Sequence, residues 1–117
     1  MSVQNRLKTL YEGLAAISPD VACYHYYASS DAEPPYIVWY EESEDAALDA
    51  DNHKVRQSVS GYVEFFTQTE FDSTFDLIQE FLNGIEGLSW SWDATQYGDP
   101  TRDDDNIIHH TWSWRMR

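Results

Sequence analysis

The feature that most limits how this chain can fold is a strict alternation of residue types between Arg56 and Thr67. Successive side chains of a β-strand point to opposite faces, so a period of two predicts a half-buried strand. One face would carry Val59, Gly61, Val63 and Phe65, and the other Ser58, Ser60, Tyr62 and Glu64. This is the longest strand expected, and the rest of the chain has to build a sheet around it.

The flanking segments predict two helices and four further strands. Apolar residues at three- and four-residue steps indicate a helix from about Ser2, its N-cap, to Ala16, and another from Phe71 to Ile85. Thr69 with Asp72 forms a loose capping box at the second helix, and Gly84 is a natural residue to end it. Short β-branched and aromatic runs indicate strands at 21–27, 35–42, 88–92 and 107–116.

The expected order is therefore helix, three strands, helix, two strands (α-β-β-β-α-β-β). Connections between consecutive strands look too short for parallel crossovers, which favours a mainly antiparallel sheet of four to five strands with two helices packed on one face. A chain of 117 residues is long enough for one domain and too short for two conventional ones. We expect a single α+β domain covering residues 1–117.

The charge of the chain excludes several functions. With 21 acids against 7 bases the formal charge is −14, which repels phosphate backbones and anionic membrane surfaces. We therefore expect no specific nucleic acid binding. We also expect no membrane partner, because in addition no apolar run approaches the roughly 20 residues that span a bilayer. One cysteine excludes an internal disulfide, and the protein is expected to be soluble and made in the cytoplasm.

No motif indicates catalysis or a cofactor. Cys23 and His25 share a strand face and could join His109 or His110 around a metal, but without a CxxC or HxxxH pattern a buried thiol and an edge histidine are favoured. The oxygen-rich segments 49–52 and 99–106 do not follow the register of a calcium loop. With no nucleophile elbow, P-loop or dinucleotide fingerprint, we expect no enzyme, no metal and no cofactor.

Two pairs of tryptophans predict aromatic ladders on neighbouring strands. Trp90 and Trp92 share one face, as do Trp112 and Trp114. Exposed ladders could stack on sugars or form a protein interface, whereas burial in the core is the default for most of them. The other face of the final strand, expected to be partly solvated, carries Ile107, His109, Thr111, Ser113 and Arg115. A sheet with one wet face and one free edge is available for assembly.

The middle of the chain resembles a known family. The segments that carry the resemblance are "PPYIVWYEE" (34–42), an acidic loop closing on "ADNHKV" (50–55), and "VEFFTQTEFDSTFDLIQEFL" (63–82). In this order they are similar to the small tail-completion proteins of phages and prophages of Gram-positive bacteria, the tail terminator-like, head–tail joining proteins. The triplet "FFT" (65–67) stands where the family usually has leucine, tyrosine and threonine.

The resemblance implies a structural virion protein without an active site. Such proteins form rings, generally hexamers, that end the tail tube and contact both the major tail protein and the head–tail connector. They would assemble in the host cytoplasm and then reside in the virion tail. A ring requires one patch on each subunit to match a different patch on its neighbour. An acidic lumen would also repel passing DNA.

Candidate interface residues follow from this requirement. The acidic run from Glu41 to Asp49 would meet a neighbouring subunit or passing DNA, and Asp51 and Asn52 would form the turn into the long strand. The full set is Glu41, Glu42, Glu44, Asp45, Asp49, Asp51, Asn52, Lys54, Arg56, Arg102 and Arg115, with Arg117 as a further basic candidate.

Two other functions remain open on the sequence. An acidic inhibitor that mimics DNA would space its carboxylates along one exposed face, and here the acids concentrate in loops. A carbohydrate-binding module would need one or more of the four paired tryptophans to be exposed.

Overall fold

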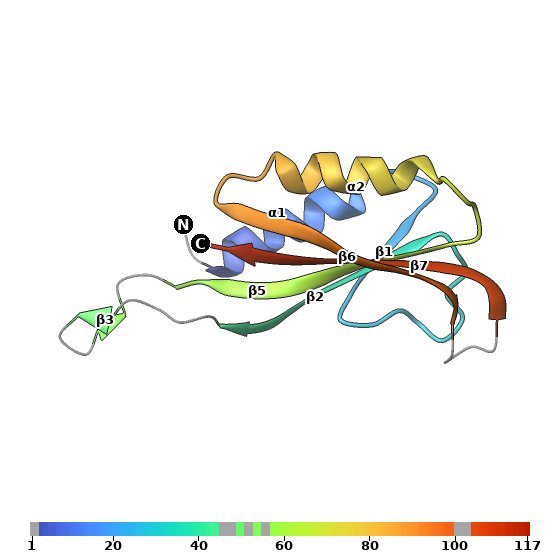
Figure 1. Ribbon diagram of the computed structural model, residues 1–117. Coiled ribbons are helices and arrows are strands. Elements are labelled where there is room, and N and C mark those ends of the chain that lie inside the picture. The colour runs from blue at the N-terminus through green and yellow to red at the C-terminus, as the bar shows by residue number, and fades with distance from the viewer. Residues whose placement is uncertain (1–2, 45–48, 51–52, 55–56, 100–103) are drawn as a thin grey trace.

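A five-stranded sheet forms one layer of the protein, and both helices pack on one of its faces (Figure 1). The computed structural model describes residues 3–44, 49–50, 53–54, 57–99 and 104–117. The elements are α1 (Val3–Ala15), β1 (Ala22–His25), β2 (Tyr36–Glu44), β3 (Asp49–Ala50), β4 (His53–Lys54), β5 (Val59–Thr67), α2 (Ser73–Asn83), β6 (Leu88–Asp99) and β7 (Asp104–Met116). The sheet has the order β1-β2-β5-β7-β6, and β3 and β4 form a separate ribbon. The predicted α+β fold and element order are confirmed, with this ribbon as an addition.

Strand β5 lies at the centre of the sheet and shows the burial that its sequence predicts. Its residues alternate between buried and partly buried from Val59 to Thr67. It pairs antiparallel with β2 on one side and with β7 on the other. Val63 faces Trp39 in β2 and Trp112 in β7, so the central layer of the core is built from three neighbouring strands.

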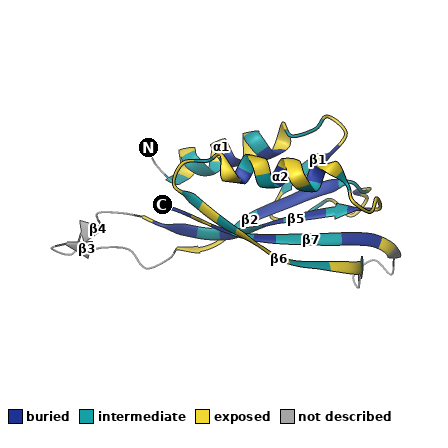
Figure 2. Cartoon of the chain, turned by 45° about the horizontal axis from the view of Figure 1, so that its top comes forward, coloured by how far each residue is buried: buried dark blue, intermediate teal, exposed yellow. Residues whose placement is uncertain are grey.

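The core lies between this sheet and the two helices. Leu10 and Leu14 of α1 and Ile78 and Leu82 of α2 are buried against it. Figure 2 shows buried positions in both helices and in the strands beneath them. A smaller buried cluster of Ala32, Tyr36 and Val38 lies on the other face of the sheet. Burial of side chains this large, at about 1.5–3 kcal/mol each, is the main driving force for a domain of this size.

The pairing of β1 with β2 is parallel, which the sequence reading did not predict. Ala22 lies opposite Tyr36 and His25 opposite Trp39. The expectation that connections between strands are too short for a parallel pair is wrong here, because β1 spans only 4 residues. The chain has to return a distance of only about 13 Å, at roughly 3.3 Å per residue, and residues 26–35 cover it without a helix.

The start of α2 also differs from the prediction. The helix begins at Ser73, and Asp72 is its N-cap, accepting a hydrogen bond from the backbone N–H of Thr74 at 2.9 Å. Asp72 is held in turn by the hydroxyl of Thr67, which donates to it at 2.7 Å. The expected capping box between Thr69 and Asp72 is therefore wrong, and Phe71 lies outside the helix and outside the core. Gly84 ends the helix as expected.

The last two strands are longer than their apolar segments predict. At 12 and 13 residues both exceed β5, which has 9, so the expectation that β5 is the longest strand is wrong. The polar stretch 93–106 was expected to be a connection, but β6 reaches Asp99 and β7 begins at Asp104. Polar side chains join the two strands there, as in the 2.8 Å contact between Thr95 Oγ1 and His110 Nδ1. Such cross-strand bonds let a polar sequence continue as a hairpin.

Gly61 provides a test of the packing at the sheet centre. A Cβ at this position would lie 2.1 Å from the carbonyl oxygen of Tyr40 and 2.6 Å from Cζ2 of Trp114. We expect Gly61→Ala to lower the free energy of unfolding by about 1–3 kcal/mol, the range for overpacking. Chemical denaturation measures this change.

Gly84→Ala is the matched control, since its Cβ would meet nothing nearer than 3.6 Å. This variant should remain within about 0.5 kcal/mol of the wild type. Equal stability of the two variants would contradict the packing described for Gly61.

Candidate functional site

The acidic residues proposed as an interface divide into distinct environments. Glu42 and Glu44 are exposed on β2, and Glu44 accepts a hydrogen bond from Gln57 Nε2 at 2.6 Å. Asp49 and Lys54 pair through their backbones in the β3–β4 ribbon. The remaining predicted positions, Asp45, Asp51, Asn52, Arg56 and Arg102, lie outside the described residues. Among the acids of this set whose exposure is described, Glu42 and Glu44 are exposed and Glu41 is partly buried.

Glu41 belongs to a polar cluster within the protein. His25 Nε2 lies 2.7 Å from its Oε2 atom, and the hydroxyl of Tyr26 donates to its Oε1 atom. The His25 ring stacks on Trp39 with the centroids 4.0 Å apart and on Tyr26 at 4.1 Å. The parallel register of β1 and β2 brings these groups together, so the main role of Glu41 is to hold β1 in place.

These contacts determine the charge of Glu41. Burial raises the pKa of the carboxyl, but the hydrogen bonds from Tyr26 and His25 outweigh it, and the pKa falls below the ordinary value of 4.5. The bond to Glu41 raises the pKa of the Tyr26 phenol. Glu41 is thus an anion fixed by two donors.

The cysteine and the three histidines whose side chains are described do not gather into a reactive centre. Cys23 and His25 lie on the helix-covered face of the sheet, whereas His109 lies on the open face and stacks on Phe66 at 4.2 Å. His110 contacts Phe75 on the helix-covered face. Burial raises the pKa of the Cys23 thiol to about 12, so it is protonated at neutral pH and inert. Within the described ranges no group of three or more metal-ligating side chains could hold an ion.

The open face of the sheet is rich in hydroxyl groups. Ser91 and Ser113 lie 3.1 Å apart across β6 and β7, and both donate to Asp93 Oδ1. A depression of about 380 Å³ lies here, and Glu42 and Arg115 line it with these serines. Arg115 thus lines the same depression as Glu42 of its own subunit. The face is partly solvated as predicted from His109 to Arg115, but Ile107 is fully buried, and Tyr36 and Val38 of β2 belong to a buried apolar cluster on this side of the sheet.

The four paired tryptophans differ in exposure. Trp90 lies opposite Trp114 and Trp92 opposite Trp112, which confirms the side-by-side ladders. Trp112 and Trp114 are buried, Trp90 packs against the core, and Trp92 is 52% exposed. Only Trp92 of this set presents a large part of its ring to solvent.

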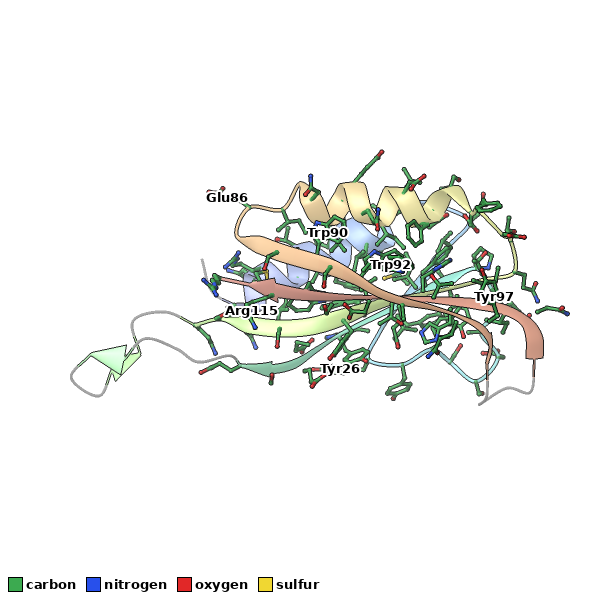
Figure 3. The ribbon with its side chains drawn as sticks, viewed as in Figure 1. Tyr26, Glu86, Trp90, Trp92, Tyr97 and Arg115 are labelled. Carbon is green, nitrogen blue, oxygen red and sulfur yellow. The ribbon has the colours of Figure 1, made fainter. Side chains whose placement is uncertain are left out.

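An aromatic groove of about 440 Å³ surrounds Trp92. It runs between the start of α2 and the far ends of β6 and β7, and Tyr97, at the end shown on the right of Figure 3, is 74% exposed. Its rim carries the carboxylates of Glu70, Asp72 and Asp76. Burial, together with nearby His109, lowers the pKa of His110, which keeps this groove-lining imidazole neutral at pH 7.

Phe71 is the most exposed of the large apolar side chains in the described residues, at 95%. Its φ of +57° is in the left-handed region, which costs a bulky residue roughly 1–2 kcal/mol. The sequence pattern placed Phe71 in the helix because Phe71 lies four residues before Phe75, and an apolar residue at that spacing is assigned to the same helix face. The "DST" at 72–74 was the signal, since an aspartate N-cap places Phe71 before the helix.

A third hollow, of about 480 Å³, lies at the end of the molecule opposite the aromatic groove. Leu10, Ile85 and Met116 line it with the two arginines Arg6 and Arg117. The Arg6 guanidinium donates to the carbonyl oxygens of Arg117 and, at 3.1 Å, of Glu86. Glu86 and Arg115 mark this end of the molecule in Figure 3.

The chain matches no protein-family model and no curated protein sequence. In the part of the chain described, no helix combines the length and apolar character needed to cross a membrane.

The Glu41 cluster predicts a specific pH dependence of stability. The folded state holds the Glu41 pKa below that of the unfolded chain, so its contribution is complete above about pH 4.5 and is lost as the pH falls through the lowered value. Glu41→Gln should cost about 1 kcal/mol at pH 7, the scale of a hydrogen bond, and less at pH 3, which lies below the ordinary value of 4.5. Urea unfolding at the two pH values measures this.

Glu42→Gln is the control, because its side chain is exposed on the adjacent position of the same strand. It should change stability at pH 7 by less than about 0.5 kcal/mol. A cost of Glu41→Gln that is the same at pH 3 as at pH 7 would show that the ionised carboxylate is not what stabilises β1.

Proposed function

We propose that this protein is a structural component of a phage or prophage tail that forms a ring at the end of the tail tube and contacts the head connector. The order of segments from residue 34 to residue 82 supports the proposal, as does the α+β fold that carries them. The protein would act by assembly and not by catalysis.

The observation that carries the proposal is an acidic arm at one end of the molecule. We use this name for Glu42, Ser43 and Glu44 of β2 together with the β3–β4 ribbon. The ribbon lies beyond the helix layer, at the end where β2 finishes and β5 begins (Figure 1). It contributes to an elongated shape of 53 × 25 × 23 Å. A projecting arm can reach an adjacent subunit while the sheet and helices keep their own core.

Ring formation gives the acids of the arm two uses. Glu42 and Glu44 can bind basic residues of a neighbouring subunit, which fixes the register of a heterologous contact. Acidic residues of the arm that face a ring lumen would repel passing DNA, and this role suits a chain with a formal charge of −14. The partners would be further copies of this chain, in a ring of about six, the major tail protein and the connector. Assembly would take place in the host cytoplasm, before the ring resides in the virion tail.

Carbohydrate binding is a second candidate function. The observation that favours it is the exposed ring of Trp92 beside exposed Tyr97 in the aromatic groove. Stacking on a sugar ring needs this kind of platform. The buried Trp112 and Trp114 cannot contribute to it, which limits the platform to one end of β6.

The test is to produce the protein together with the major tail protein of the same genome and to examine the tubes by electron microscopy. We expect rings at tube ends and tubes of limited length. Replacing Glu42 and Glu44 by glutamine should weaken ring attachment roughly two- to thirtyfold, because each exposed ion pair contributes about 0.2–1 kcal/mol.

A double variant of Asp20 and Glu33, changed to asparagine and glutamine, removes the same charge away from the arm. Both residues are exposed in loops on other parts of the chain. It should form rings as the wild type does. Tubes of unrestricted length without rings, in the presence of the wild-type protein, would refute the proposed function.

A further inference from the structure

Phe71 lies in a turn that is held rigidly and serves no internal packing. The backbone N–H of Thr69 donates to Thr67 Oγ1 at 3.1 Å, and Thr67 in turn donates to Asp72, the N-cap of α2. This brace fixes Phe71 in a left-handed conformation with its ring in solvent. A strained backbone that persists without an internal contact indicates a function for the side chain it presents.

The surroundings of Phe71 define the chemistry of what it can bind. Trp92 and Tyr97 provide further exposed aromatic surface beside it, and Glu70 and Asp76 add negative charge. We call this surface the Phe71 knob. Aromatic rings next to carboxylates favour an apolar cavity with a cationic rim, since both cation–π and ionic contacts can then form.

The other end of the same chain provides such a cavity. Leu10, Ile85 and Met116 give the 480 Å³ hollow its apolar lining, and Arg6 and Arg117 outnumber Glu86, the one acid among its described lining residues. We call it the Arg6 hollow.

Arg6 is already positioned by its bonds to Arg117 and Glu86, so its guanidinium is ordered before a partner arrives. Gly87, which lines the same hollow, has a φ of +79°, and a Cβ there would lie 2.7 Å from the backbone oxygen of Arg117, so glycine is required at this position.

From this complementarity we infer that the Phe71 knob of one copy inserts into the Arg6 hollow of the next, forming a head-to-tail contact. The inference rests on the proposed function and deepens it, because it names two further surfaces, besides the acidic arm, through which copies of the chain join. The two surfaces lie at opposite ends of the molecule (Figures 1 and 3), so each copy can bind two others. Such a heterologous contact produces a ring if the rotation between copies closes, and a filament if it does not.

The experiment uses variants that remove one surface at a time. Phe71→Gly removes the knob and replaces a strained residue by one that accepts positive φ, so its urea midpoint should equal or exceed that of the wild type. Thr9→Trp fills the hollow from an exposed position on α1. Each variant alone should self-associate at least about tenfold more weakly than the wild type, as expected for a central anchor residue.

Mixing the two variants distinguishes this contact from other modes of association. Phe71→Gly retains its hollow and Thr9→Trp retains its knob, so an equimolar mixture should form dimers and nothing larger. Sedimentation velocity at concentrations up to about 0.5 mM detects these species. Tyr27→Ser removes another exposed aromatic ring, 79% accessible, outside both surfaces, and should associate as the wild type does.

Each remaining outcome gives a clear decision. A wild-type protein that stays monomeric up to that concentration, or a Phe71→Gly variant that associates normally, overturns the inference. If the wild type is monomeric and an arginine-rich peptide or a soluble glycan quenches the fluorescence of Trp92, the inference is also overturned. The groove is then assigned to another partner. Normal rings on tail tubes with Phe71→Gly would leave the proposed function intact, and head-to-tail oligomers that never cap tubes would refute that function alone.

Discussion

The packing of Trp112 is the interaction on which the rest of the structure depends. Its fully buried ring lies opposite Val63 of β5 and Trp92 of β6, and its Nε1 atom donates to Gln79 of α2 at 3.1 Å. One side chain thus joins the central strand, the outer strand and a helix. Phe75 lies in the first turn of α2, and its ring centroid is 4.9 Å from that of Trp112. This contact fixes the turn that precedes the helix. The aromatic groove is therefore a direct extension of the core.

The sequence predicted the parts of the fold that depend on local periodicity. Alternation from residue 56 to residue 67 identified β5 because one face of that strand is buried along its whole length. Periodicity does not predict a conformation that a hydrogen bond decides, as at Asp72, whose cap leaves Phe71 outside the helix. The parallel pairing of β1 was not predictable either, because no local pattern records which way a short strand runs. Polar continuation of β6 and β7 depends on contacts across the hairpin, which a single strand does not reveal.

The candidate surfaces were predictable to a smaller extent. Composition identified an acidic run, and Glu42 and Glu44 of this run are exposed. Glu41 carries the same charge and lies next to them, yet its partners His25 and Tyr26 come from a strand that only the folded sheet places there. The Arg6 hollow joins residues at the two ends of the sequence. Sequence reasoning can name residue types for such a site, but it cannot bring them together.

The position of β7 has a consequence for how the protein reaches its fold. This strand lies between β5 and β6, although it follows both in the sequence. Val59 pairs with Met116, so the central pairing closes a loop of more than fifty residues, whereas β6 and β7 form a local hairpin. Hairpins form quickly and distant pairings slowly, so the β6–β7 hairpin is expected to form first and then to dock on β5. Until that docking, β5 and β7 each present an unpaired apolar edge, and a nascent chain at this stage is open to pairing with others.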